Sequence, residues 1–167
     1  MYVFVMKDSG PKARIVAKGC RQVHGVDYGE TYAPVLKFTS VRAMLATVAV
    51  HNLELHQMDV VTAFLHGEID KEIYMSVPSG FRDPSRPDLV CKLKKALYGL
   101  KQAPRLWHSK IDKFLIDDLQ FVCSPNDPCL YTRHCSEKHC ADSAVRGRPI
   151  NRWQQHGCHN LGQGGAQ

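Results

Sequence analysis

The sequence predicts a mixed α/β (α+β) fold, in which short strands and amphipathic helices follow one another along a chain of 167 residues. Three observations support this class. Hydrophobic residues make up 44% of the chain and charged residues 23%, which is typical of a globular domain that buries a core. Residues 72–77 alternate polar and apolar side chains, as a half-buried strand does. From Pro104 onward, apolar residues recur at helical spacing.

The first predicted strand is Lys12–Lys18, where apolar Ile15 and Val16 are flanked by cations and Gly19 ends the pattern. Residues 20–36 are polar and rich in glycine and aspartate. Because they end near a proline, which has no backbone N–H to donate, they favour an irregular loop.

A helix is predicted next, with Ser40 as its N-cap. It should cover a sheet through the apolar stripe Val41, Met44, Leu45, Val48 and Ala49. The alternation that follows predicts a strand from Leu53 to about Val60, which would place the carboxylate of Asp59 at its end.

The second half of the chain contains two further predicted strands and one helix. Glu72–Val77 should turn Ile73 and Met75 toward one face, and Leu89–Leu93 forms the next strand. The helix begins at Pro104, since proline suits a first helical turn. Its stripe comprises Trp107, Ile111, Phe114 or Leu115, and Leu119. From about Thr132 this apolar periodicity ends, which predicts a disordered tail.

Charge and cysteine content restrict the partners and the compartment. The formal charge of +6 and the pI near 9.0 suit a polyanion such as nucleic acid. Neither a secretory leader nor a membrane-spanning apolar run is apparent, so we expect no secretion and no membrane contact. The seven cysteines are odd in number and irregularly spaced, which favours reduced thiols in the cytoplasm or the nucleus.

Three segments occur in an order that carries a family resemblance: Lys12–Gly19, Leu55–Gly67 and Leu97–Trp107. Together with shorter blocks at 28–35, 72–75, 78–81 and 129–131, they resemble the copia-type reverse transcriptases of Ty1/copia retrotransposons. The similarity covers about residues 12–132. It implies the fingers and part of the palm of a right-handed polymerase in residues 1–133, followed by an unrelated tail, 134–167.

The resemblance implies that Asp59 is the first metal-binding aspartate and that the backbone carbonyl of Val60 is a further metal contact. Phosphoryl transfer of this kind needs two divalent ions, and Mg²⁺ prefers carboxylate oxygen. From the residues alone, an aspartate at a strand end is more often a turn or cap residue.

The same resemblance implies nucleotide binding by Thr62, Ala63 and Phe64, with the Phe64 ring lying beneath the sugar and excluding a ribose 2′-hydroxyl. Lys12 and Arg14 resemble cations that meet the triphosphate or the template phosphates. The alternatives are a core phenylalanine and a solvated basic strand. Val61 and Thr62 also depart from the family, which commonly has more polar residues at these positions, often Lys or Asn, so weaker triphosphate binding is expected.

Gly99, Lys101, Gln102 and Pro104 resemble the block beneath the template and the nascent base pair, where small residues let nucleic acid approach the backbone. The alternative interpretation of these residues is a loop followed by the start of a helix, without any bound ligand. The implied partners are therefore an RNA or DNA template-primer and deoxynucleoside triphosphates. No protein partner is indicated.

The family's second catalytic block, Tyr-Val-Asp-Asp, does not occur in this sequence. Asp117-Asp118 imitates it but falls within the predicted helix, where a solvated face explains it better. We therefore expect a reverse transcriptase fragment that is catalytically inactive alone, since Asp59 cannot hold two metal ions by itself. The alternatives are a non-catalytic nucleic-acid-binding module and a second chain that supplies the aspartates. The tail could also offer zinc ligands: Cys135, Cys140, His156, Cys158 and His159. An out-of-frame or intron-derived extension explains them better.

Overall fold

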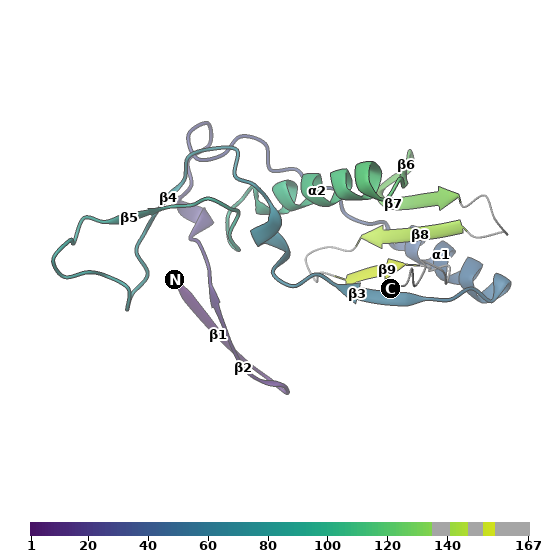
Figure 1. Cartoon of the computed structure of the whole chain (residues 1–167), viewed down its shortest axis with the longest axis horizontal. Helices are drawn as coiled ribbons and strands as arrows, with labels where there is room; N and C mark the ends of the chain where they lie inside the picture. The colour runs from purple at the N-terminus through teal and green to yellow at the C-terminus, as the bar shows by residue number, and fades with distance from the viewer. Residues whose placement is uncertain (135–140, 147–151, 156–167) are drawn as a thin grey trace, which may run out of the picture. The chain divides into compact units, whose positions relative to one another are not determined.

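The computed structural model describes residues 1–134, 141–146 and 152–155. The chain forms two compact units, each built from two separate segments. Unit 1 comprises Met1–Ala33 and Thr62–Asp112, and unit 2 comprises Pro34–Val61 and Lys113–Gln167. Helices and antiparallel strands occur in both units (Figure 1), which confirms the mixed α/β class. No helix in the described part of the chain has the length and hydrophobicity to traverse a bilayer.

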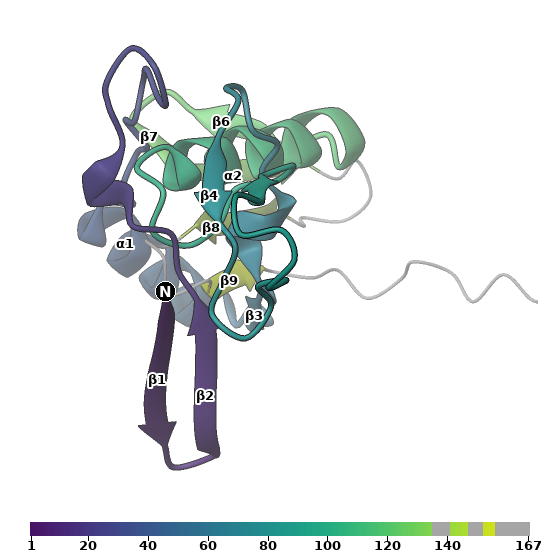
Figure 2. The same ribbon diagram turned by 90° about the vertical axis from the view of Figure 1, so that its left-hand side faces the viewer.

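Unit 1 begins with a two-stranded antiparallel hairpin of β1 (Tyr2–Lys7) and β2 (Gly10–Ile15), whose strands run side by side as a narrow ribbon (Figure 2). Gly10 has a φ of 108°, which suits the turn. The sequence analysis did not predict β1. Its first predicted strand, Lys12–Lys18, corresponds to β2, which starts and ends earlier than predicted. The 3₁₀ helix η1 (Gly19–Arg21) follows shortly after the end of β2.

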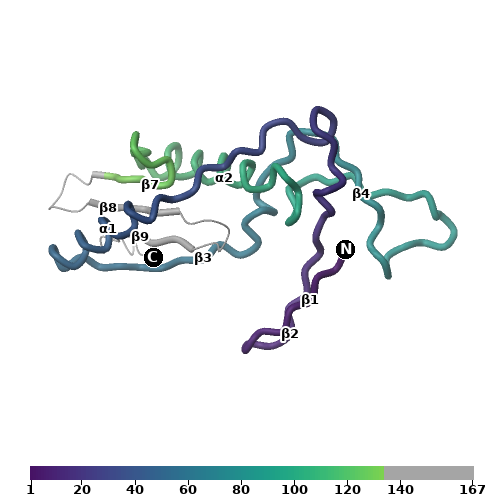
Figure 3. The backbone as a smooth tube through the Cα atoms, turned by 180° about the vertical axis from the view of Figure 1, so that it is seen from behind, coloured from purple at the N-terminus to yellow at the C-terminus, as the bar shows by residue number. Residues whose placement is uncertain are grey.

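A second antiparallel pair in unit 1 joins β4 (Tyr74–Ser76) to β5 (Val90–Lys92), with a wide loop between them (Figure 3). Ile73 is buried and Met75 half-buried, whereas Tyr74 is exposed. The predicted alternation is therefore confirmed. Both strands are shorter than the predicted segments.

Helix α2 (Ala103–Lys113) starts next to the predicted residue Pro104 and buries Leu106, Trp107 and Ile111. It continues in unit 2 as the π-helical turn η3 (Phe114–Asp118), where Leu115 is buried. The predicted stripe is thus confirmed in its Trp107, Ile111 and Leu115 members. The core of unit 1 forms around the start of α2 and comprises Ala17, Ile73, Ala96, Leu100, Ala103 and Leu106.

Unit 2 contains a five-stranded antiparallel sheet. Its strands, in spatial order, are β3 (His56–Asp59), β9 (Arg152–Gln155), β8 (Ala141–Arg146), β7 (Asp127–His134) and β6 (Val122–Ser124). The predicted strand Leu53–Val60 appears as the shorter β3. Strands β8 and β9 lie in the segment for which the sequence predicted disorder, and in the structure both pair with neighbouring strands. The cysteines and histidines considered as zinc ligands lie outside the described residues.

Helix α1 (Phe38–His51) of unit 2 has Lys37 as its N-cap, so the prediction of Ser40 as the cap was wrong. Ser40 lies inside the first turn, and its hydroxyl donates a hydrogen bond to Asp127 at the start of β7 (Oγ to Oδ2, 2.5 Å). Within the predicted stripe, Met44 is buried, Val41 and Val48 are half-buried, and Leu45 is exposed. The helix therefore covers less apolar surface than its sequence pattern predicted.

Asp127 is 1% exposed and accepts three hydrogen bonds through its carboxylate. Besides the Ser40 hydroxyl, the backbone N–H groups of Lys37 (3.1 Å) and Cys129 (3.0 Å) donate to it. The carboxylate thus lies at the N-terminus of α1, where the helix dipole favours a negative charge. A residue about ninety positions away in the sequence anchors the beginning of this helix.

Candidate functional site

Asp59 is the last residue of β3, as predicted, and its side chain is exposed. Its Cα pairs with that of Arg152 in β9, which fixes the end of the strand at this point. Val60 follows and is half-buried. The strand thus delivers a solvent-accessible carboxylate at its carboxyl end.

The described residues of the chain contain no group of three or more histidine, cysteine, aspartate or glutamate side chains that could hold a metal ion. Asp117 and Asp118 lie on η3 with exposed side chains, as the solvated-face interpretation predicted. Mg²⁺ takes several oxygen ligands, and a pair of such ions needs more than one carboxylate. The described residues therefore do not fit a two-metal site.

Phe64 belongs to unit 1 and lies on the 3₁₀ helix η2 (Ala63–His66). It is half-buried against the core, with its ring centroid 5.5 Å from that of Tyr98 at an angle of 47°. Thr62, the N-cap, has φ 52° and ψ 42°, a left-handed conformation that is strained for a β-branched residue. Ala63 is 1% exposed. This arrangement combines the core phenylalanine of the alternative interpretation with a partly accessible ring.

Lys12 and Arg14 lie two positions apart on β2 and therefore point to the same face of the hairpin. Lys12 is exposed and Arg14 half-buried. Neither side chain has an ion pair or hydrogen bond with any residue that the structure describes. Both cations are free to meet an anion.

The block that begins at Gly99 packs closely on the segment after β2. The backbone N–H of Ala17 donates to the carbonyl of Tyr98 at 2.8 Å. A Cβ atom on Gly99 would lie 2.2 Å from the Ala17 carbonyl oxygen, and one on Gly19 would lie 2.0 Å from the Gly99 carbonyl oxygen. Both glycines are therefore required by packing within unit 1, whether or not nucleic acid binds.

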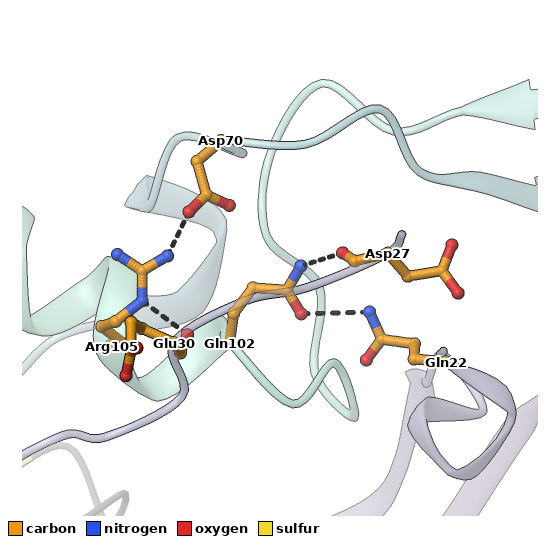
Figure 4. A network of polar contacts seen from close by, with 6 residues as sticks. All are labelled: Gln22, Asp27, Glu30, Asp70, Gln102 and Arg105. Atoms are coloured by element: carbon orange, nitrogen blue, oxygen red, sulfur yellow. Dashed lines mark hydrogen bonds and ion pairs between the residues drawn. The ribbon is translucent and has the colours of Figure 1, made fainter. Parts of the chain in front are cut away.

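Gln102 is fully buried, and its side-chain amide is satisfied within unit 1 (Figure 4). Its Nε2 donates to the carbonyl of Asp27 at 2.9 Å, and its Oε1 accepts from Nε2 of Gln22 at 3.0 Å. Lys101 donates its backbone N–H to Oε1 of Gln22 (2.8 Å) and its Nζ to the hydroxyl of Tyr28 (2.9 Å). These contacts hold the irregular segment that precedes residue 33.

Arg105 extends the same network from the first turn of α2. Its Nε donates to the carbonyl of Glu30 at 2.8 Å, and its guanidinium forms an ion pair with Asp70 (Figure 4). The sequence analysis missed Arg105, Gln22 and Asp27, because their contacts in this network join residues 35 to 80 positions apart. The only local signal was polarity, which predicted a solvated loop.

Comparisons with known proteins give the family. The family model described as "Reverse transcriptase (RNA-dependent DNA polymerase)" matches residues 2–141. The chain is 45% identical over 142 residues to the "Retrovirus-related Pol polyprotein from transposon TNT 1-94" of Nicotiana tabacum, covering 81% of this chain and 11% of that protein. It is 48% identical over 120 residues to the Pol polyprotein from transposon RE2 of Arabidopsis thaliana, covering 72% and 8%.

A more distant relative is the "Transposon Ty1-ER2 Gag-Pol polyprotein" of Saccharomyces cerevisiae, 31% identical over 122 residues, which are 70% of this chain and 6% of that protein. No solved structure matches the chain. The chain spans about a tenth of the length of its plant relatives. It therefore belongs to the reverse transcriptase family of copia-type retrotransposon Pol polyproteins, and it corresponds to a fragment of such a polyprotein.

Proposed function

We propose that this chain derives from an RNA-directed DNA polymerase and does not polymerise DNA by itself. The observation that supports the proposal is the isolation of Asp59, which ends β3 without a cluster of metal-ligating side chains among the described residues. Reverse transcriptases use divalent metal ions. The sequence of 167 residues contains no Tyr-Val-Asp-Asp block that would complete a two-ion site with Asp59.

The proposal keeps the binding roles that the family resemblance implies. Asp59 and the carbonyl of Val60 would contact Mg²⁺, and Thr62, Ala63 and Phe64 would contact the nucleotide. Lys12 and Arg14 would meet phosphates of the triphosphate or the template. Their partners would be a template-primer of RNA or DNA and deoxynucleoside triphosphates, in the cytoplasm or the nucleus.

The template block would act partly through packing. Gln102 is buried, so we propose that it positions the neighbouring backbone rather than contacting nucleic acid directly. Gly99, Lys101 and Pro104 lie near Gln102 in the sequence, and Gly99 and Lys101 are both exposed on the loop before α2. A template strand would therefore meet the loop backbone and the Lys101 side chain.

A primer-extension assay tests the inactivity. The purified chain, with Mg²⁺, deoxynucleotides and a primed RNA template, is expected to give no extension above a blank without protein. Asp59→Asn should give the same result, because the unmodified chain has no activity to lose. A complete copia-type enzyme serves as the positive control. Template-dependent extension by this chain that disappears in Asp59→Asn would contradict the proposal.

A second candidate function, a nucleic-acid-binding module without chemistry, is favoured by the unpaired cations on β2 and the formal charge of +6. The chain is expected to bind a single-stranded oligonucleotide in a salt-dependent way. Neutralising Lys12 and Arg14 with glutamine should reduce the slope of log affinity against log salt by roughly 1.4, about 0.7 for each phosphate contact. Fluorescence anisotropy at several salt concentrations measures this slope. Absence of binding at low salt would exclude the candidate.

A further inference from the structure

One face of the β1–β2 hairpin of unit 1 consists of apolar side chains alone. Side chains alternate between the two faces along a strand, and residues directly opposite each other in an antiparallel pair share a face. The register of the hairpin therefore brings three residues of β1 together with their three partners of β2. This apolar face comprises Tyr2, Phe4 and Met6 of β1 and Pro11, Ala13 and Ile15 of β2.

The apolar face is open to solvent along most of its length. Phe4 is 75% exposed and Met6 77%, and all three members from β2 are exposed as well. Tyr2, at the base of the hairpin, is half-buried, and its ring stacks on that of Phe4 with the ring centroids 6.1 Å apart. A contiguous apolar surface of this kind typically marks an interaction site, because its removal from water is favourable.

The opposite face of the hairpin carries its cations. Lys7, Lys12 and Arg14 lie on that face, together with Val3 and Val5. The two strands therefore separate positive charge from the apolar face. When two copies pack through their apolar faces, these cations point away from the contact, so the formal charge of +6 on each chain does not bring like charges of the hairpins together.

A second copy would also supply the layer that a two-stranded hairpin lacks. Two strands alone are marginally stable in water, and their apolar face has to pack on another layer to support them. At the base of the hairpin, the backbone N–H of Val16 donates to the carbonyl of Met1 at 2.8 Å. Toward the turn at Gly10 the strands continue as a narrow ribbon (Figure 2). A second hairpin laid on this ribbon would enclose the apolar side chains of both copies between two layers about 10 Å apart.

We propose that the apolar face is a homodimer interface, in which the hairpins of two copies of this chain pack face to face about a two-fold axis. Such an interface uses the same residues from both copies. Phe4 and Met6, the most exposed aromatic and aliphatic members, form its centre. The cationic faces stay outside, so Lys12 and Arg14 remain accessible to the phosphates proposed above. The inference itself does not depend on the binding of nucleic acid.

The size of the apolar face sets the strength of the expected dimer. An aromatic side chain offers about 150–250 Å² for burial, so the six side chains together give roughly 500 Å² per copy. Two such faces bury on the order of 1,000 Å² in total, which is less than the roughly 1,200–2,000 Å² of stable complexes. The dimer is therefore expected to be reversible, with a dissociation constant on the order of 10 µM.

Sedimentation equilibrium of the full chain, under reducing conditions and without nucleic acid, tests the dimer over about 1–300 µM. The double variant Phe4→Thr/Met6→Thr removes the centre of the apolar face but keeps residues that favour a strand. It should raise the dissociation constant at least about tenfold, because each substitution occurs twice in a symmetric dimer. The matched control, Val3→Thr/Val5→Thr, changes the opposite face of the same strand and should alter the constant by no more than about twofold.

The outcomes decide whether a second copy occupies the apolar face. A monomer at every concentration would overturn the proposal, and so would open-ended association without a defined dimer. Equal weakening by the two double variants would place the contact elsewhere and overturn it too. Hydrogen exchange in residues 2–15 shows whether the hairpin persists in each variant. Should Phe4→Thr/Met6→Thr unfold it, Ala13→Glu provides the test, because it brings two carboxylates together in the interface and should abolish the dimer. Ser9→Glu, in the exposed turn, should not.

Photocrosslinking identifies the contacting surface directly. With p-benzoylphenylalanine in place of Phe4, irradiation is expected to join the chain to residues 2–15 of a second copy. A mixture of isotope-labelled and unlabelled chains distinguishes adducts between copies from adducts within one copy. Adducts confined to other peptides would contradict face-to-face packing of the hairpins. Sodium sulfate should strengthen the dimer, because sulfate favours the burial of apolar surface. Weakening by sulfate would show that the contact is not apolar.

Discussion

Replacing Gly99 with alanine is expected to unfold unit 1. The new Cβ atom would lie 2.2 Å from the Ala17 carbonyl oxygen and 2.7 Å from Cγ1 of Val16, distances at which the backbone has to move. The φ of 98° adds strain, since residues with a side chain rarely adopt it. Together these effects should destabilise the unit by more than about 4 kcal/mol.

Denaturant unfolding followed by Trp107 fluorescence measures this loss, because Trp107 is 8% exposed within unit 1. Trp153 is replaced by phenylalanine in every protein compared, so that one fluorophore remains. Gly80→Ala is the matched control: its φ is 91°, but nothing lies within 4 Å of the new Cβ. Gly80→Ala should lower the free energy of unfolding by only about 1 kcal/mol, because it adds the backbone strain without a steric clash. Similar losses in the two variants would show that the close approach to Ala17 is unimportant.

Replacing Asp127 with alanine is expected to release the N-terminus of α1 in unit 2. Three donors lose their acceptor, two of them backbone N–H groups and one the Ser40 hydroxyl. Unpaired donors at a buried site and the lost charge at the helix terminus should together cost about 3 kcal/mol. Hydrogen exchange in peptides covering 37–51 measures the loss of protection. Asp118→Ala, an exposed acid of the same unit, should leave those amides unchanged, and equal effects would contradict the assignment.

The same carboxylate gives unit 2 a defined response to acid. Burial raises the pKa of Asp127, but the hydrogen bonds from Ser40, Cys129 and Lys37 outweigh burial and lower it below the usual value. A lowered pKa means that the stabilisation is complete above the ordinary aspartate pKa of about 3.9 and is lost as the pH falls through the pKa of the folded state. Protection of α1 should therefore decrease below about pH 4. Asp127→Ala should remove this component of the pH dependence.

The sequence correctly predicted those elements whose buried face is set by residues close together in the chain. The alternation around Ile73 and the stripe through Trp107 and Ile111 are found where expected, because burial of one face is encoded by neighbouring residues. Ser40 shows where such reasoning fails. A serine at this position favours an N-cap, but Ser40 lies in the first turn of α1, and its hydroxyl donates to Asp127, which is distant in the sequence. Single-sequence patterns do not encode such long-range partners.

The candidate site was predictable to the same extent. The position of Asp59 at a strand end could be predicted, because the alternation in Leu53–Val60 is a local signal. The chain then continues to η2, where Phe64 is half-buried. The roles of Gln102 and Gly99 in packing were not predictable, since they depend on Asp27 and Ala17, which approach only in the folded unit.

The order of strands in unit 2 has a consequence for the first aspartate of the family. β3 is at one edge of its sheet, and its single neighbour there is β9, Arg152–Gln155. The reverse transcriptase family model matches residues 2–141, so β9 lies outside the matched residues. The described neighbour of His56–Asp59 therefore lies beyond the residues that the family model matches, and a polypeptide shortened to His134 would leave that strand without this hydrogen-bonding neighbour.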